Sequence, residues 1–181
     1  EKNRIIALPA AITDPGYSPA VTGLKWIASY PRNIESGIPR ASAVLILNDQ
    51  HTGYPYALLE AAKISALRTA ASAALAAFWL NGKEARANTV SFIGAGVIAR
   101  NILDILFAEQ WAFNGIYVHD TDASSSRAFI SHGTTRNDMP IKEATLETAL
   151  SSDIVIFATN SGTPYVSGAD RFRSGQIILN I

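Results

Sequence analysis

The segment from Thr89 to Arg100, with the sequence TVSFIGAGVIAR, constrains the fold of this chain more than any other stretch. Its first residues are mostly β-branched or aromatic and predict a buried parallel strand. Gly94-Ala95-Gly96 predicts a tight turn, and from Val97 onward apolar residues recur at helical spacing. A strand, a glycine turn and a helix in this order are typical of the start of a nucleotide-binding βαβ unit.

The glycine turn has the pattern G-x-G-x-x-A, and each of its small residues has a physical reason. Gly94 permits the sharp turn, Gly96 lets the backbone approach a pyrophosphate, and Ala99 keeps the helix close to the strand. The diphosphate would then lie against free amides at the positive end of the helix. The alternative is a purely structural glycine turn, because such turns between strands and helices are common.

The sequence after the turn favours the dinucleotide interpretation. A second strand, Gly115 to His119, ends at Asp120, at about the 20-residue distance where an acidic side chain holds a ribose hydroxyl. A carboxylate there predicts NAD rather than NADP, since it repels the extra phosphate. Strands at 153–158 and 176–181, with a helix expected over 142–150, continue a doubly wound sheet. The cofactor-binding residues expected in this half are Gly94, Ala95, Gly96, Val97, Ile98, Asp120, Thr159 and Asn160.

The first third of the chain predicts a different architecture, a meander of antiparallel strands. The expected strands cover residues 4–8, 22–29, 41–47 and 54–59. A long helix, about Leu59 to Leu80, joins the two parts, and Asn81 to Asn88 is expected to be a polar connector. The predicted buried stripe of this helix consists of Ile64, Leu67, Ala71, Ala74, Leu75 and Phe78. Its alanines at positions 70, 71, 73, 74, 76 and 77 are expected to allow close packing against neighbouring elements.

Composition excludes several classes of function. The chain has 15 lysines and arginines and 15 aspartates and glutamates, so its formal net charge is zero. It has no cluster of basic residues of the kind that would predict binding to nucleic acid or to a membrane. There are no cysteines, which excludes disulfides, thiolate metal sites and cysteine nucleophiles and favours a cytoplasmic location. His51, His119 and His132 fit no metal-ligand spacing, so no metal site is expected. No G-x-S-x-G motif supports serine hydrolase chemistry.

Two cations stand in unusual surroundings. Lys25 shares a strand face with Ile27, although taken alone the residue is better explained as an exposed lysine on the outer face of a strand. Arg68 has no acidic residue three or four positions away on its helix. Either a tertiary contact or a ligand anion would therefore have to balance its charge.

Taken together, Arg4, Lys25, Arg68 and the glycine turn point to a known family. The chain resembles the ornithine cyclodeaminase and mu-crystallin family over essentially its full length. Within that family it looks most like the branch that makes 2,3-diaminopropionate for siderophores and peptide antibiotics. The resemblance is carried by RIIALP, GLKWIAS, PRASAVLILND, TGYPYALLEAAKISALRTAASAALAA and FIGAGVIARN, and the block 39–77 is its most specific part.

The resemblance implies an α/β protein with two domains. Residues 83–181 would form a Rossmann-type NAD-binding domain, incomplete at its C-terminal end. Residues 1–82 would form part of an α+β substrate-binding and dimerisation domain with its linking helix, so that the chain is expected to be a fragment of a longer, homodimeric protein. In the family, the residues matching Arg4, Lys25 and Arg68 hold substrate carboxylate, and the threonine matching Thr69 lies near the cofactor phosphates.

The implied reaction is the NAD-dependent oxidation of N-(2-amino-2-carboxyethyl)-L-glutamate, followed by hydrolysis to 2-oxoglutarate and 2,3-diaminopropionate. Lys25 would also be catalytic by polarising the reacting amine or imine. Arg40 is a fourth candidate cation for a substrate with three carboxylates, or else a surface residue. The family's catalytic acid would lie beyond Ile181. The alternatives are an ornithine cyclodeaminase, a ketimine reductase or other amino-acid dehydrogenase, and a binding protein without turnover.

Overall fold

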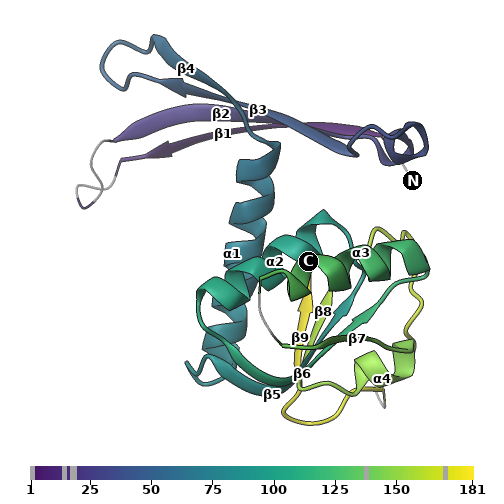
Figure 1. Ribbon diagram of the computed structural model, residues 1–181. Coiled ribbons are helices and arrows are strands. Elements are labelled where there is room, and N and C mark those ends of the chain that lie inside the picture. The colour runs from purple at the N-terminus through teal and green to yellow at the C-terminus, as the bar shows by residue number, and fades with distance from the viewer. Residues whose placement is uncertain (1–2, 14–15, 17–19, 137–138, 169–170) are drawn as a thin grey trace. The chain divides into compact units, whose positions relative to one another are not determined.

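The computed structural model describes residues 3–13, 16, 20–136, 139–168 and 171–181. It divides into two compact units, Glu1–Ser65 and Ala66–Ile181 (Figure 1). The division falls inside helix α1, Ala62–Leu80, whereas the sequence analysis placed it between residues 82 and 83. The assignment of 1–82 to substrate and 83–181 to cofactor stays a prediction. An antiparallel sheet in the first unit and a parallel α/β sheet in the second confirm the predicted fold class.

The first unit is a four-stranded antiparallel meander in the order β1-β2-β3-β4. Its strands are β1 (Arg4–Ile12), β2 (Val21–Ser29), β3 (Ala41–Asn48) and β4 (Pro55–Glu60), with a 3₁₀ helix, η1 (Pro31–Ser36), between β2 and β3. Asp49 forms the β3–β4 turn, because its Oδ1 accepts hydrogen bonds from the backbone N–H groups of His51 and Thr52 at 3.1 and 2.8 Å. The four strands expected from the sequence are all present, and β1 extends to Ile12 rather than ending at Leu8.

The register of this sheet sorts its side chains onto two faces. Residues directly opposite each other in an antiparallel pair project to the same face. The pairs Arg4–Ser29 and Leu8–Lys25 therefore place Arg4, Lys25 and Ser29 on one face, here named the cationic face. The opposite face, named the apolar face, carries Ile5, Trp26, Val44 and Leu58.

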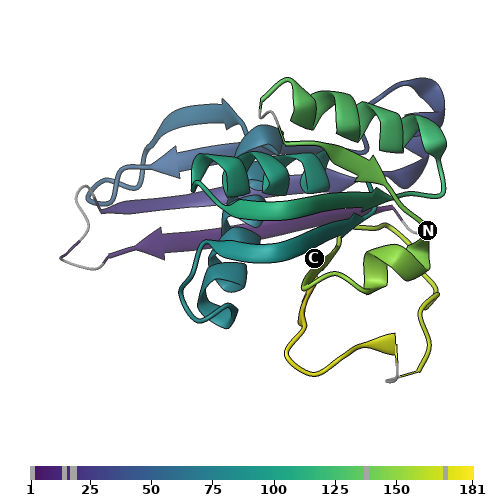
Figure 2. The same ribbon diagram turned by 60° about the horizontal axis from the view of Figure 1, so that its bottom comes forward.

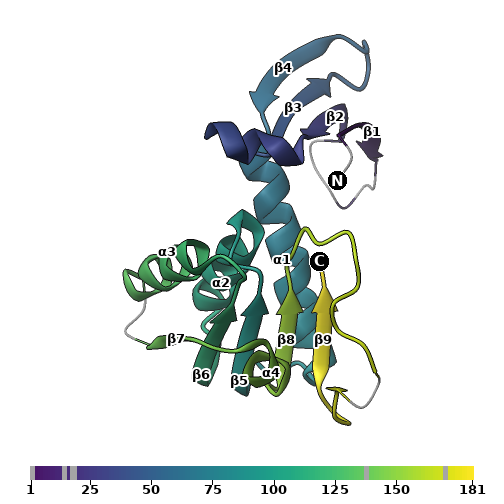
Figure 3. The ribbon, with the colours of Figure 1, turned by 90° about the vertical axis from the view of Figure 1, so that its right-hand side faces the viewer.

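The second unit is a five-stranded parallel sheet in the order β7-β6-β5-β8-β9 (Figure 3). Its strands are β5 (Arg86–Ile93), β6 (Ala112–His119), β7 (Ile141–Glu143), β8 (Ile154–Phe157) and β9 (Ile177–Asn180), and its further helices are α2 (Val97–Ala108), α3 (Ala123–Thr134) and α4 (Leu146–Leu150). The strand order reverses between β5 and β8. Ligands of such sheets bind in the crevice outside the carboxyl ends of the strands at this reversal.

Alternate residues of the central strands fill two cores on the two sides of this sheet. Val90 and Phe92 pack with the alanines of α1 and with α2 and α3, and Phe92 lies 4.9 Å from the Phe129 ring of α3. Ile93 and Val155 point the other way and pack with α4. Figure 2 shows α2 and α3 on one side of the strands and α4 on the other. Buried on both faces, the strands read as nearly continuous apolar runs, which is why the sequence predicted them.

The predicted stripe of α1 was largely wrong. Ile64, Leu67 and Leu75 are 45, 36 and 58% exposed. The buried side is instead made of alanines, of which only Ala74 belonged to the predicted stripe; its buried alanines are Ala66, Ala70, Ala73, Ala74 and Ala77. Alanine has no side chain beyond Cβ, so it lets the helix approach the sheet closely, and the close packing expected of Ala70, Ala73, Ala74 and Ala77 is confirmed.

Two further expectations need correction. The helix expected over 142–150 is a short strand, β7, followed by the five-residue helix α4. Ile141 is buried and pairs with Ile116 of β6, and the Thr145 side chain then caps α4 by accepting from the Thr148 N–H. The polar connector ends earlier than predicted, because Arg86 already pairs with Ala112 in β5.

Candidate active site

Gly94 is required by the geometry of the turn after β5. Its φ is +95°, and a Cβ there would lie 2.5 Å from the carbonyl oxygen of Ala158, at the end of β8. Its N–H donates to the carbonyl of His119 at 2.8 Å, at the end of β6. The turn is thus held against both neighbouring strands, and no side chain fits at this position.

Gly96 has a different environment. Its φ is −73°, which any residue adopts, and no atom of the described residues lies within 4 Å of an added Cβ. It is the N-cap of α2, and within the described residues no side-chain capping hydrogen bond is made there. Ala99, one turn into the helix, is fully buried against the core. The described residues thus leave open space at the N-terminus of α2, whose first N–H groups have no acceptor within the helix itself, as binding of a phosphate group requires.

The other expected residues of the turn divide between core and surface. Ala95 is buried, Ile98 is half-buried and Val97 is 59% exposed. Val97 therefore presents an apolar surface beside the open space at Gly96. Ala95 contributes its backbone rather than its side chain.

Asp120 lies at the carboxyl end of β6, between the glycine turn and α3. Its Oδ2 accepts from the Ala95 N–H at 2.8 Å, and its Oδ1 accepts from the Asp122 N–H at 2.9 Å. Asp122 caps α3, and hydrogen bonds from the hydroxyl groups of Ser124 and Ser125 lower the pKa of Asp122 to about 2. Two carboxylates therefore stand at the end of β6, where a ribose would approach the sheet.

Thr159 and Asn160 are exposed directly after β8. The Thr159 methyl group lies 3.1 Å from the position of a Cβ at Gly94, so this residue borders the glycine turn. The Tyr165 hydroxyl donates to Thr159 Oγ1 at 3.3 Å, a contact that sequence reasoning missed. An open groove of about 430 Å³ beside them is lined by Phe157, Thr159, Ser161, Gly162, Thr163, Pro164, Tyr165, Val166, Ile178 and Asn180.

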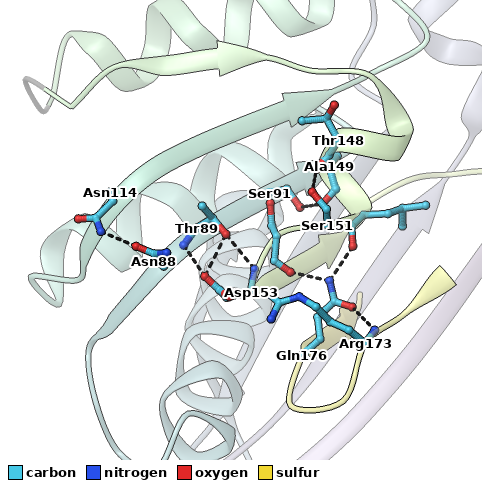
Figure 4. A network of polar contacts seen from close by, with 12 residues as sticks. Asn88, Thr89, Ser91, Asn114, Thr148, Ala149, Ser151, Asp153, Arg173 and Gln176 are labelled. Atoms are coloured by element: carbon cyan, nitrogen blue, oxygen red, sulfur yellow. Dashed lines mark hydrogen bonds and ion pairs between the residues drawn. The ribbon is translucent and has the colours of Figure 1, made fainter. Parts of the chain in front are cut away.

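A polar network at the opposite end of the strands anchors the β8–β9 connection (Figure 4). Asp153 accepts from the N–H and hydroxyl groups of Thr89 at 2.8 and 3.0 Å and forms an ion pair with Arg173. The Gln176 side chain donates to the carbonyls of Leu150 and Ser152. Partial burial raises the pKa of Asp153, but the hydrogen bonds from Arg173 and Thr89 outweigh it, so the net shift is downward.

The cationic face of the first unit brings together two of the predicted substrate residues, Arg4 and Lys25. Lys25 Nζ donates to Ser65 Oγ, from the start of α1, at 3.1 Å. Arg40 Nε donates to Ser29 Oγ at 3.2 Å. Ser29 and Ser65 gave no signal in the sequence, because serine is common and neither belongs to a motif.

Arg68 and Thr69 belong to the second unit, Arg68 exposed and Thr69 half-buried. Their convergence with the cationic face stays a prediction. Among the residues that the structure describes, no group of three histidine, aspartate or glutamate side chains could hold a metal ion. In the same residues, no helix is long and apolar enough to cross a membrane.

Known proteins share this sequence and architecture. An N-((2S)-2-amino-2-carboxyethyl)-L-glutamate dehydrogenase of Staphylococcus aureus is 32% identical over 99% of this chain and 53% of its own length. The Thermococcus litoralis Δ(1)-pyrroline-2-carboxylate reductase, solved with NADH and L-proline, has a TM-score of 0.81 at 27% identity, over 99% of this chain and 58% of that one. An archaeal alanine dehydrogenase dimer with bound NAD has a TM-score of 0.79 at 25% identity, over 98% and 56% of the two chains.

The family assignment rests on a match over nearly the whole chain. The chain spans about half the length of the relatives it matches, 53% in the case of the S. aureus enzyme. The sequence profile of the ornithine cyclodeaminase/mu-crystallin family matches residues 2–181, as the sequence motifs predicted. The chain therefore belongs to the ornithine cyclodeaminase/mu-crystallin family.

Proposed function

We propose that this chain is part of an NAD-dependent amino-acid dehydrogenase and that its second unit binds NAD. The residues present fit this cofactor: Gly96 leaves open space before uncapped helix amides, and Asp120 stands where a ribose hydroxyl would be bound. NAD, when bound, supplies the hydride acceptor. Thr159 and Asn160, beside the glycine turn, would orient the reacting end of the cofactor, and Thr69 would contact its phosphates.

The proposed substrate is N-(2-amino-2-carboxyethyl)-L-glutamate, which yields 2-oxoglutarate and L-2,3-diaminopropionate after oxidation and hydrolysis. The observation that carries this proposal is the cationic face, where Arg4 and Lys25 share one side of the sheet. A substrate with three carboxylates needs several cations, whereas ornithine has one carboxylate and a distal amine. The 32% identity to the S. aureus enzyme supports the same choice.

In this proposal the protein binds and orients the substrate. The Lys25 ammonium group, positioned by its hydrogen bond to Ser65, would contact a substrate carboxylate and polarise the reacting amine or imine. Arg4 and Arg68 would hold carboxylates through charge-assisted hydrogen bonds. These groups orient the substrate and stabilise its charges. Hydride transfer from the bound substrate to the bound cofactor then proceeds as an effectively intramolecular step.

The second candidate function is that of a cyclodeaminase or an imine reductase of the same family. The fold shared with the T. litoralis reductase supports the reductase as an alternative. The test offers N-(2-amino-2-carboxyethyl)-L-glutamate and L-ornithine, each with NAD, to the full-length protein. Cofactor reduction together with 2-oxoglutarate release from the first substrate is the expected result. Proline and ammonia from ornithine, without 2-oxoglutarate from the conjugate, would assign the protein to the cyclodeaminase branch.

We further propose that the full-length protein is a cytoplasmic homodimer that supplies diaminopropionate for siderophore or peptide-antibiotic synthesis. The exposed apolar face of the first unit supports a homodimer, because Ile5, Trp26 and Leu58 are 48, 49 and 71% exposed. The related archaeal alanine dehydrogenase was solved as a dimer.

A further inference from the structure

The connection that follows β8 is folded back on itself. The Ser161 hydroxyl donates to the carbonyl of Thr163 at 2.7 Å, and the Tyr165 hydroxyl donates to Thr159 Oγ1 at 3.3 Å. The second hydrogen bond joins the first and last residues of the segment 159–165. This segment is therefore a closed loop at the carboxyl end of β8, where a ligand of the sheet would lie.

The Tyr165 end of this loop is anchored in the core on the α4 side of the sheet. The Tyr165 ring centroid lies 6.3 Å from that of Phe157, and the Phe157 centroid lies 6.4 Å from that of Phe172 in an edge-to-face arrangement. Phe157, Phe172 and Val166 pack against the buried residues of this core. These contacts fix the ring of Tyr165, which is 43% exposed, while its hydroxyl group reaches Thr159.

The Thr159 end of the loop borders the glycine turn. Thr159 is exposed, and its methyl group lies 3.1 Å from the position of a Cβ at Gly94. A phenol is more acidic than an aliphatic hydroxyl, so Tyr165 is the donor and Thr159 the acceptor. Among the described residues no acceptor is found for the hydrogen of the Thr159 hydroxyl, which therefore remains to donate to a ligand. The hydrogen bond from Tyr165 polarises this hydroxyl and strengthens it as a donor.

We propose that Tyr165 is a positioning residue for NAD, which holds Thr159 so that its hydroxyl donates to an acceptor on the nicotinamide half of the cofactor, such as a ribose oxygen or the carboxamide carbonyl. This inference rests on the proposed function, in which Thr159 orients the reacting end of NAD. Without the Tyr165 hydroxyl, the Thr159 side chain is free to turn among its staggered rotamers. Part of the free energy of NAD binding is then spent on fixing that side chain again.

The test measures the dissociation constants of NAD and of ADP for the full-length protein by calorimetry. ADP carries the adenosine half of the cofactor and lacks the nicotinamide half. Tyr165→Phe keeps the ring and removes the hydroxyl, and it should weaken NAD by about fivefold and ADP by less than about twofold. Tyr117→Phe is the matched control, because Tyr117 is a half-buried tyrosine of β6, which β5 separates from β8. It should change neither affinity.

A second variant tests whether Tyr165 acts through Thr159. Thr159→Val removes the acceptor and keeps a side chain of similar shape, and in this background Tyr165→Phe should weaken NAD no further. A further loss of similar size in that background, equal weakening of both probes, or an unchanged NAD affinity of the Tyr165→Phe variant would overturn this role and leave the proposed NAD site standing. An unmodified protein that binds neither probe would instead remove both the NAD site and the role of Tyr165.

Discussion

At the scale of single residues, the two glycines of the turn separate what the fold needs from what a ligand needs. Gly94 has a positive φ, and a Cβ at this position would lie 2.5 Å from the carbonyl oxygen of Ala158. The fold therefore requires glycine here, whether or not a ligand is bound. Gly96 has an ordinary φ and open space around it. The fold would accept a methyl group at Gly96, and only a bound phosphate would exclude it.

This contrast gives a matched pair of substitutions. Gly94→Ala should lower the free energy of unfolding by at least about 2 kcal/mol, through strain at positive φ and the clash with Ala158. Gly96→Ala should change it by about 1 kcal/mol or less and weaken NAD binding at least about tenfold. Urea denaturation of the full-length protein measures the free energy of unfolding, and titration with NAD measures the cofactor affinity. Unchanged NAD affinity in a stable Gly96→Ala variant would place the pyrophosphate elsewhere.

Asp120 carries the prediction of cofactor choice. Its carboxylate is fixed by the N–H groups of Ala95 and Asp122, and the charge of Asp122 stands beside it. The protein should bind NAD more tightly than NADP, since the phosphate of NADP would meet this negative charge. Asp120→Asn should weaken the binding of NAD. It should also lower the ratio of the dissociation constant of NADP to that of NAD by about tenfold. Equal or tighter binding of NADP by the unmodified protein would contradict the assignment.

At the scale of elements, the sequence predicted strands better than helix faces. The parallel strands are buried on both sides and read as apolar runs, so β5, β6, β8 and β9 were all expected. The buried face of α1 is alanine, which carries little hydrophobic signal, and the three-residue strand β7 is too short to show a period. Motif residues such as Gly94 and Asp120 could be found because their spacing has a chemical reason. Ser29, Ser65 and Tyr165 could not, since only the tertiary fold brings them to their partners.

The β8–β9 connection illustrates how distant elements fix a site. Its groove residues, Thr159 and Tyr165, lie at the carboxyl ends of the strands, whereas its anchor, the Asp153–Arg173 ion pair, lies at the opposite ends. Asp153 also holds Thr89 at the middle of β5 through two hydrogen bonds. One carboxylate at the start of β8 thus joins β5 to the segment that leads into β9.

The lowered pKa of Asp153 predicts a pH-dependent contribution to stability. Its pKa in the folded protein lies below the ordinary pKa of an aspartate, so the stabilisation is complete above that ordinary pKa and is lost as the pH falls through the folded pKa. Asp153→Asn should therefore cost about 1 to 2 kcal/mol at pH 7, a value discounted because the side chain is 33% exposed.

Urea denaturation at pH 7 and at pH 3 measures this difference, which should shrink at the lower pH. Glu35→Gln is the control, because it breaks the exposed Arg32–Glu35 pair and should cost only about 0 to 0.5 kcal/mol at pH 7. A deficit of the Asp153→Asn variant that is the same at both pH values would show that packing, rather than charge, is responsible.

At the scale of the whole molecule, the two units differ in how well they bury their apolar residues. The second unit encloses two cores, one on each side of its sheet. The first unit has few buried apolar side chains among its described residues, and large side chains remain exposed on both faces of its sheet. A face of this kind is stable in water when another surface covers it. The apolar face is the side for which a second copy is proposed.

Trp26 is at the middle of this face, opposite Val44 of the neighbouring strand, and is 49% exposed. Trp26→Glu should convert the full-length dimer into monomers, because a buried interface does not accommodate an unpaired carboxylate. Size-exclusion chromatography with light scattering measures the mass directly. Ile34→Glu is the matched control, since Ile34 is 60% exposed on η1, outside the sheet, and should leave the dimer intact. A folded Trp26→Glu variant that stays dimeric would move the interface to another surface, and a monomeric unmodified protein would remove the dimer from the proposed function.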